Sequence, residues 1–420
     1  MIYNILEQVF GDFMRDILHC DLNNFFASCE CLKDESIRNL PVAVCGNIED
    51  RHGIVLAKNY PAKDKGVKTG HTIWQAKQLC PNLVTVLPHF DMYVEFSKKV
   101  KNIYLDYTDM VEPFSIDECW IDVTNSKRFG DAVTIANEIR QRVLNETGLT
   151  ISVGVSFNKI FAKLGSDMKK PNAVTVITKD NFKQKVWPLP VSDMLMIGRS
   201  TTKKLNDMGV FTIGQLANLS KEFLREKFGK NGETLYYYSN GIGNDNVRNY
   251  YDIVPPKSIG NSTTCYKDLT TNKEVKEVLS TVATSVVSRM LDSGYSNAKT
   301  VKLWVKDNAL ETYGKQCKLS GQSTYENITK TAYDLFVSLY DWKLPVRGLG
   351  ISVCDFCDGN VQLDLFGTVS QKSKKLDETI LRVNSKYGTS AIKQGNSLFD
   401  EKLGRSLGGL HSYQNSKNEK

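Results

Sequence analysis

Two adjacent acids lie inside a run of strand-forming residues, and this pairing constrains the fold of the chain more than any other feature. The run covers residues 114–123, and the acids are Asp117 and Glu118. Successive side chains of a plain strand point to opposite faces, so a plain strand would separate the two carboxylates. A turn or bulge would bring both toward one site, and bulges are common beside active sites. The alternative is a surface hairpin whose acids are only solvated.

A third acid, Asp21, ends the apolar run 17–20 and makes the surface hairpin a weaker explanation. Acids that close two apolar strands can meet at adjacent strand ends, where crowded carboxylates require cations. Mg²⁺ prefers oxygen ligands and leaves room for substrate phosphates. Two such ions can stabilise both oxygens of an in-line phosphoryl displacement. The three acids therefore predict a metal-dependent site of the kind that nucleotidyl transfer needs.

Strand-like and helix-like segments alternate up to about residue 178, which predicts an α/β domain with a mixed sheet. The predicted strands are 15–21, 42–45, 53–57, 84–87, 151–155 and 173–177, and residues 113–124 form a predicted hairpin that carries the adjacent acids. The predicted helices are 24–31, 59–66, 73–79, 93–107, 131–147 and 159–166. The helical pattern is clearest in 131–147, where the apolar residues recur on one face.

Residues 180–245 have a different pattern, which predicts short helices joined by short loops. Within them, Gly198 and Arg199 precede a helix, and a glycine turn at a helix N-terminus can offer backbone N–H groups to a phosphate. Met196 stands where the first glycine of a helix-hairpin-helix is usual, and a plain helical hairpin is an equal alternative.

Residues 246–256 include two prolines and predict a linker, after which an α+β module begins at residue 257. Its clearest strands are 301–305 and 350–353, and its clearest helices are 275–293 and 328–339. Three lysines flank or lie on the first of these strands: Lys299, Lys302 and Lys306. They either face a nucleic-acid backbone or belong to a solvated strand face.

Composition sets bounds on the class of protein. The chain has 420 residues with 41% hydrophobic content, which supports several folded domains, and a net charge of +7, which permits a polyanionic partner without requiring one. The 10 cysteines in a long chain without a secretory signal predict reduced thiols and a cytoplasmic protein. Cys354 and Cys357 form a CxxC pair without a second pair, so we expect ordinary thiols. We expect no membrane segment, and we expect residues 1–13 to be either a short extension or an artefact of the assigned start site.

Four motifs in order resemble the Y-family translesion DNA polymerases, the UmuC/DinB-like enzymes that include bacterial DNA polymerases IV and V. The motifs are Asp21–Glu30, Asn59-Tyr60 with Gly66–Lys68, Ser115–Glu118 and Lys169–Asn172. The resemblance covers the chain from about Met14 to the mid-350s. Each motif alone is weakly specific, whereas four in order with compatible spacing are strongly specific.

This resemblance implies a right-hand polymerase architecture. It consists of an α/β palm, small fingers, an all-helical thumb with a helix-hairpin-helix-like element, and an α+β little finger. The implied bounds are an extension at 1–13, palm at 14–24 and 92–178, fingers at 25–91, thumb at 179–245, linker at 246–256, little finger at 257–356 and a flexible tail at 357–420.

The resemblance also implies a chemistry, namely template-directed and error-prone addition of dNTPs to a primer 3′-hydroxyl by two-metal catalysis. Asp21 and Asp117 would hold both ions, Glu118 would hold the ion beside the 3′-hydroxyl, and the Leu22 carbonyl would complete the nucleotide-side ion. The implied cofactor is Mg²⁺, for which Mn²⁺ can substitute.

The nucleotide contacts come from the same resemblance. Phe26 would be a steric gate that collides with a ribose 2′-hydroxyl, and Phe25 beside it is expected to pack into the core under the nucleotide. Tyr60, Lys63 and Lys170 would contact the triphosphate. The family often has Arg where Lys63 stands, and Lys lacks the bidentate fork of Arg.

The tail contains an apolar segment, 362–366, that resembles the motif by which bacterial proteins bind the sliding clamp. Gln362, Leu363, Leu365 and Phe366 would make the contacts in an extended conformation. The implied partners are primer-template DNA, dNTP and the clamp. The implied setting is a monomer that acts in DNA damage tolerance in the bacterial cytoplasm.

Two other functions compete with a polymerase. A catalytically idle, UmuC-like DNA- and clamp-binding protein would have the same domains, but the presence of all three carboxylates argues against it. A nucleotidyl cyclase has a similar palm, but it would not explain the linker, the C-terminal module or the tail.

Overall fold

The computed structural model describes residues 15–47, 53–243, 246–357, 371–387 and 391–392. By its internal contacts the chain divides into two compact units. The first comprises Met1–Val44, Leu56–Thr69 and Trp74–Asp252, and the second comprises Cys45–Val55, Gly70–Ile73 and Ile253–Lys420. The N-terminal extension and the clamp-like segment 362–366 lie outside the described residues.

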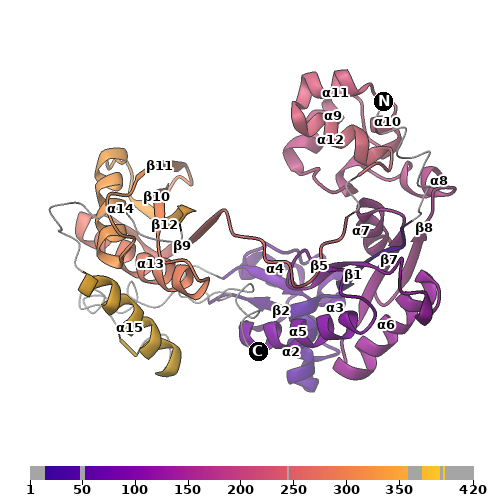
Figure 1. Ribbon diagram of the computed structural model, residues 1–420, viewed down its shortest axis with the longest axis horizontal. Coiled ribbons are helices and arrows are strands. Elements are labelled where there is room, and N and C mark those ends of the chain that lie inside the picture. Colours follow the sequence, from indigo (N-terminus) through magenta and orange to yellow (C-terminus); the bar gives the residue numbers. More distant parts are fainter. Residues whose placement is uncertain (1–14, 48–52, 244–245, 358–370, 388–390, 393–420) are drawn as a thin grey trace. The chain divides into compact units, whose positions relative to one another are not determined.

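A five-stranded sheet with the order β5-β6-β1-β7-β8 forms the palm (Figure 1). Its strands are β5 (Val111–Pro113), β6 (Glu118–Asp122), β1 (Ile17–Leu22), β7 (Ile151–Ser156) and β8 (Val174–Ile177). The central strand β1 is antiparallel to β6 and β7, whereas β7 and β8 are parallel. The predicted mixed sheet is thus confirmed.

Strand β1 is buried along its whole length because helices cover both faces of the palm sheet. Leu18, Cys20 and Leu22 pack in a core with residues of α5 (Phe90–Leu105) and α6 (Ala132–Thr147). The alternate residues of β1 point toward α7 (Lys159–Met168), where His19 meets Ser166. This alternation places Asp21 on the α7 side of the sheet.

The fingers consist of small elements. A three-stranded sheet has the order β3-β2-β4, with β2 and β4 parallel. The elements are α2 (Phe25–Lys33), η1 (Glu35–Ile37), β2 (Val42–Cys45), β3 (Val55–Lys58), α3 (Tyr60–Asp64), α4 (Ile73–Leu79) and β4 (Val84–Val86). Asn59 caps α3, because its side chain accepts a hydrogen bond from the Ala62 amide at 3.2 Å. A further 3-10 turn of the palm is η2 (Lys127–Phe129).

The predicted all-helical thumb is also confirmed. It contains α8 (Phe182–Val186), η3 (Val191–Asp193), α9 (Arg199–Asp207), α10 (Ile213–Ala217), α11 (Lys221–Phe228) and α12 (Lys230–Ser239). Thr212 and Gln215 form a reciprocal capping box at α10. The helices share one apolar core, in which Leu205, Leu216 and Leu224 are fully buried.

The little finger is a four-stranded antiparallel sheet, β11-β10-β12-β9, with two helices on one face. Its elements are β9 (Ser258–Leu269), α13 (Asn272–Asp292), β10 (Ala298–Asp307), β11 (Thr312–Lys318), α14 (Tyr325–Leu339) and β12 (Val346–Phe356). The sequence pattern did not predict β9 or β11. Strand β11 is an exposed edge strand without apolar alternation, so its backbone pairing with β10 defines it as a strand.

Within the tail, the sequence pattern of residues 376–387 fits a short helix, and the structure has a helix there, α15 (Gln371–Tyr387). It contacts α13 and α14, so it packs on the helical layer of the little finger. Asp377 of α15 accepts a hydrogen bond of 2.9 Å from the amide of Tyr325, the first residue of α14. This bond satisfies an N–H group at the N-terminus of α14 that has no partner within the helix. Its two residues are 52 positions apart in the chain, so a local sequence pattern does not reveal it.

Candidate active site

The turn between β5 and β6 decides where the adjacent acids lie. The amides of Phe114 and Ser115 both donate to the Glu118 carbonyl, at 2.9 and 3.2 Å. Residues 114–117 therefore form the bend of a tight hairpin, and Glu118 begins β6. The predicted turn is confirmed, and it frees Asp117 from the strict alternation of a strand.

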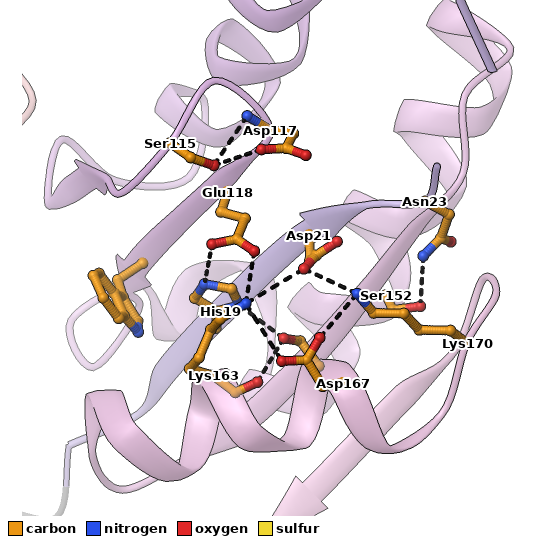
Figure 2. Close-up of polar contacts among 12 residues, drawn as sticks. His19, Asp21, Asn23, Ser115, Asp117, Glu118, Ser152, Lys163, Asp167 and Lys170 are labelled. Carbon is orange, nitrogen blue, oxygen red and sulfur yellow. Dashed lines mark hydrogen bonds and ion pairs between the residues drawn. The ribbon is translucent and has the colours of Figure 1, made fainter. Parts of the chain in front are cut away.

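Asp21 and Glu118 lie directly opposite each other on β1 and β6. Directly paired residues of antiparallel strands have side chains on the same face of the sheet, close enough to interact. Two pairs further along, on the same face of the sheet, His19 and Trp120 meet edge to face with ring centroids 5.3 Å apart. Figure 2 shows the Asp21 and Glu118 side chains on the side of the sheet that α7 covers.

Lys163 of α7 lies between these two carboxylates. Its Nζ is 2.6 Å from Glu118 Oε1 and 3.5 Å from Asp21 Oδ2. Its side chain is only 14% exposed, so the ammonium group is a nearly buried cation that offsets two acids. The sequence prediction missed this residue, although three acids in one buried site require positive charge nearby.

Lys170 is the second cation of the site. Its Nζ lies 3.0 Å from Asp21 Oδ2 and 2.9 Å from Asp167 Oδ1. The segment that carries Lys170 is tied to the end of β1, because the Asn172 amide donates to Asn23 Oδ1 at 2.9 Å. Asn23 in turn donates to Ser152 Oγ of β7 at 3.0 Å (Figure 2). These bonds hold the predicted triphosphate lysine beside the first predicted acid.

Asp117 faces a different partner in the structure. Its Oδ1 accepts a hydrogen bond from Ser115 Oγ at 2.5 Å, apart from the Asp21–Lys163–Glu118 contacts (Figure 2). Burial is the main cause that raises the pKa of Asp117, and Asp21 adds to the effect. Burial likewise raises the pKa of Glu118 to about 7, with Asp21 adding to it and Lys163 opposing it. Additional positive charge nearby would therefore stabilise the ionised form of both carboxylates.

His19 lies under the acids as a neutral imidazole. Burial, with Lys163 and Lys170 nearby, holds its pKa well below the usual value. Ser166 Oγ donates to the Lys163 carbonyl, so it accepts from His19 Nδ1 at 2.8 Å. His19 Nε2 is then an acceptor without a hydrogen-bond partner among the described residues, 3.9 Å from Glu118 Oε2.

The predicted nucleotide contacts gather near Asp21. Lys63 Nζ lies 5.5 Å from the centroid of the Tyr60 ring. Burial raises the pKa of Tyr60, while Lys170 and Asp21 act on it electrostatically in opposite directions. Burial and the neighbouring Lys63 lower the pKa of Lys58, a basic residue of this group that the sequence prediction missed.

Phe25 and Phe26 differ in their surroundings as expected. Phe25 is 3% exposed and belongs to the palm core. Phe26 is partly buried and packs against the edge of that core.

The predicted DNA contacts belong to the thumb and to the little finger. Gly198 and Arg199 line an open cavity of about 630 Å³ at the start of α9 in the thumb. On β10, Lys302 and Lys306 alternate with the buried Val301, Leu303 and Val305, so they lie on the sheet face opposite the core. By the same alternation Lys299 lies on the side that carries the helices. The structure brings two of the three predicted lysines together.

The chain matches three family models. Residues 20–167 match the impB/mucB/samB family, residues 256–365 match the C-terminal domain of that family, and residues 194–243 match the thumb domain of DNA polymerase-iota. Among curated relatives, DNA polymerase IV of Acetivibrio thermocellus is 49% identical over 93% of this chain and 99% of the relative. DNA polymerase IV 1 of Bacillus subtilis is 36% identical over 92% of this chain and 94% of the relative.

A solved structure of a Y-family DNA polymerase chimera has the same fold, with a TM-score of 0.73 over 82% of this chain and 100% of that chain, at 24% identity. The chain belongs to the impB/mucB/samB family, the Y-family DNA polymerases. It is a DNA-directed DNA polymerase of the translesion type. No described helix is long and apolar enough to span a bilayer.

Proposed function

We propose that this polymerase works by two-metal nucleotidyl transfer, with Asp21, Asp117 and Glu118 as its carboxylate ligands. The observation that carries the proposal is the direct opposition of Asp21 and Glu118 on β1 and β6, with Asp117 in the adjoining turn. Asp21 and Asp117 would hold both ions, and Glu118 and the Leu22 carbonyl would each complete one. When bound, Mg²⁺ or Mn²⁺ supplies activation of the primer 3′-hydroxyl and offsets charge on the leaving pyrophosphate.

The donor set fits hard divalent cations. All the proposed ligands are oxygen atoms, which Mg²⁺ prefers, and burial leaves two of the carboxylates in need of positive charge. Within the described ranges, no three His, Cys, Asp or Glu side chains are arranged to hold one ion. Asp117 is hydrogen-bonded to Ser115, so its carboxylate has to turn from Ser115 to join the other two.

The basic residues around the acids support a triphosphate site. Tyr60, Lys63 and Lys170 would contact the triphosphate, and Lys58 lies near enough to Lys63 for the two charges to interact. Phe26 would exclude a ribose 2′-hydroxyl. Gly198 and Arg199 of the thumb and Lys302 and Lys306 of the little finger would contact the DNA backbone.

The cellular role follows from the class of enzyme and from the tail. We infer that the polymerase extends primers past lesions in DNA damage tolerance in the bacterial cytoplasm. It would act as a monomer held at the primer end by a sliding clamp, through Gln362, Leu363, Leu365 and Phe366. The named relatives are bacterial DNA polymerases IV, which supports this setting.

The metal assignment is tested by primer extension with Asp117→Ala. We expect extension to fall by about a hundred- to a thousandfold, because removing a group that stabilises transition-state charge costs on this scale. Binding of primer-template DNA should stay within about twofold of the parent, because phosphate contacts supply most of the affinity.

Asp180→Ala is the matched control, since Asp180 is an exposed acid of the same unit. It should leave extension unchanged. Near-parental extension by Asp117→Ala, with Mg²⁺ present, would overturn the assignment of the site.

A further inference from the structure

A buried carboxylate, Glu30 of α2, lies behind the proposed sugar gate without being part of the acid cluster. Its side chain is 4% exposed. It accepts hydrogen bonds from the Tyr93 hydroxyl, from His89 Nδ1 at 2.9 Å and from the His89 amide at 3.3 Å. A buried carboxylate with this many donors is a built site, because burial without them would be costly.

The contact between Lys33 and His89 shows which ring nitrogen of His89 carries the proton. Lys33 Nζ lies 2.7 Å from His89 Nε2, and an ammonium group can only donate. His89 Nε2 therefore accepts, so the ring proton is on Nδ1 and points at Glu30. The order of donation runs from Lys33 through His89 to Glu30.

Tyr93 connects this network to the gate. Burial, and then its hydrogen bond to Glu30, raise the pKa of the Tyr93 hydroxyl, so the hydroxyl keeps its proton and donates to Glu30. The aromatic ring of Tyr93 stacks on the Phe26 ring, with centroids 4.3 Å apart and an angle of 11° between the planes.

Phe90 completes the aromatic support. Its ring meets Phe26 at 86° and Tyr93 at 84°, with centroids 6.0 and 5.8 Å away. Tyr93 is fully buried, whereas Phe26 is only partly buried. A displacement of the Tyr93 ring would thus pass directly to the Phe26 ring, the proposed gate.

We propose that Glu30 and His89 are positioning residues that hold the Tyr93 ring, and through it Phe26, in the plane that discriminates deoxyribose from ribose. The inference rests on the proposed role of Phe26 as the gate. Glu30 and His89 act on sugar choice without touching the nucleotide. Losing their hydrogen bonds should loosen the gate more than it slows insertion of the correct sugar.

The experiment measures kcat/KM for single-nucleotide insertion with a dNTP and with the matching ribonucleotide, and takes the ratio. Glu30→Gln should lower that ratio about tenfold, because an amide cannot accept all three donors and small misplacements at a site have large effects. His89→Ala should lower it similarly, whereas His89→Asn, which retains an N–H donor near Nδ1, should restore most of it.

Glu35→Gln is the matched control, because Glu35 is an exposed acid next to α2 and lies outside the network. It should leave the ratio unchanged. Tyr93→Phe removes only the hydroxyl, so it provides the same test if Glu30→Gln does not fold.

Phe26→Ala separates failure of the inference from failure of the proposed gate. If Phe26→Ala leaves the ratio unchanged, the gate itself is assigned wrongly. If Phe26→Ala lowers the ratio while Glu30→Gln, His89→Ala and Tyr93→Phe match the parent, the positioning role is overturned. In the Phe26→Ala background, Glu30→Gln should have no further effect. An equal effect with and without Phe26 would also overturn the inference.

Discussion

At the scale of single residues, the site is organised by charge balance. Two acids directly opposed on neighbouring strands repel each other, and Lys163 lies between them with contacts of 2.6 and 3.5 Å. Glu118, Asp21 and Asp167 raise the pKa of Lys163 although burial alone would lower it, so the group stays charged. In the metal-free protein, the Lys163 ammonium group therefore stabilises the two acids in the region proposed for the metal ions.

We predict that Lys163→Met lowers the thermal midpoint of the metal-free protein by about 3–8 °C. The reason is that two nearly buried carboxylates lose a partner, at a cost of about 1–3 kcal/mol. Adding Mg²⁺ should raise the midpoint more in the variant than in the parent, because a ligand of the folded state stabilises it. Thermal unfolding with a chelator and with Mg²⁺ measures both effects.

The exposed Lys77 of α4 offers a matched control, Lys77→Met, which should behave as the parent does. Equal Mg²⁺ shifts in the Lys163 variant and the parent would mean that Lys163 and the ions do not share this site.

At the scale of elements, the close approach of α7 to the sheet delivers Lys163 and Ser166 to β1. Gly154 of β7 permits that approach. A Cβ at Gly154 would lie 1.9 Å from the Ala162 carbonyl oxygen and 2.6 Å from the Ser166 amide nitrogen, both backbone atoms of α7. On the helix side, Gly165 faces Gly154. Two glycines thus set the distance between the helix and the sheet.

Gly154→Ala should therefore push α7 away from the sheet. We predict a loss of about 3 kcal/mol of stability and a fall in thermal midpoint of roughly 6–12 °C, since backbone cannot yield as a side chain can. Primer extension should fall as well, because Lys163 moves with α7. Circular dichroism melts and primer extension provide the measurements.

Gly198→Ala is suited as the stability control, since a Cβ there meets nothing within 4 Å and its φ is not in the left-handed region. A Gly154→Ala protein that melts like Gly198→Ala would show that the sheet and helix adjust at no cost.

At the scale of the whole molecule, the proposed functions are spread over separate folded parts. The acids lie in the first unit, whereas Lys302 and Lys306 lie in the second. A mildly basic chain of net charge +7 does not by itself define a DNA-binding face. Strand alternation on β10 defines the face that we propose to contact DNA.

We predict that Lys302→Gln with Lys306→Gln weakens binding to primer-template DNA. The slope of log K against log salt should shrink by about 0.9 for each phosphate that the variant no longer neutralises. Lys299→Gln is the matched control, because Lys299 is an exposed lysine of the same strand on the side with the helices. The prediction fails if Lys299→Gln changes the slope as much, per substituted lysine, as the double variant does. Binding titrations at several salt concentrations measure the slope.

The tail carries the last prediction at this scale. Leu365→Ala with Phe366→Ala should remove binding to the sliding clamp and clamp-stimulated synthesis, because these side chains are the proposed apolar anchors. Extension of short primers without the clamp should not change, since tethering acts only through effective concentration. Equal clamp affinity of variant and parent in a direct binding assay would leave the segment without a role.

The sequence by itself determined the local features of this protein. Alternation of strand and helix patterns predicted the α/β palm and the helical thumb, and acids at strand ends predicted the site, because these signals depend on near neighbours in the chain. Phe25 and Phe26 were also assigned from their motif. Strands β9 and β11 escaped prediction, because the first is polar and the second is exposed, and pairing with distant strands defines both.

Only the tertiary structure decided which distant groups meet. The register of β1 against β6 sets Asp21 opposite Glu118, and the packing of α7 brings Lys163 between them. The position of His89 next to α2 gives Glu30 its donors. These interactions join residues far apart in the chain, and their geometry depends on strand register and on helix packing. Neither is encoded in a local pattern, since a shift of one residue in register would turn Asp21 to the other face.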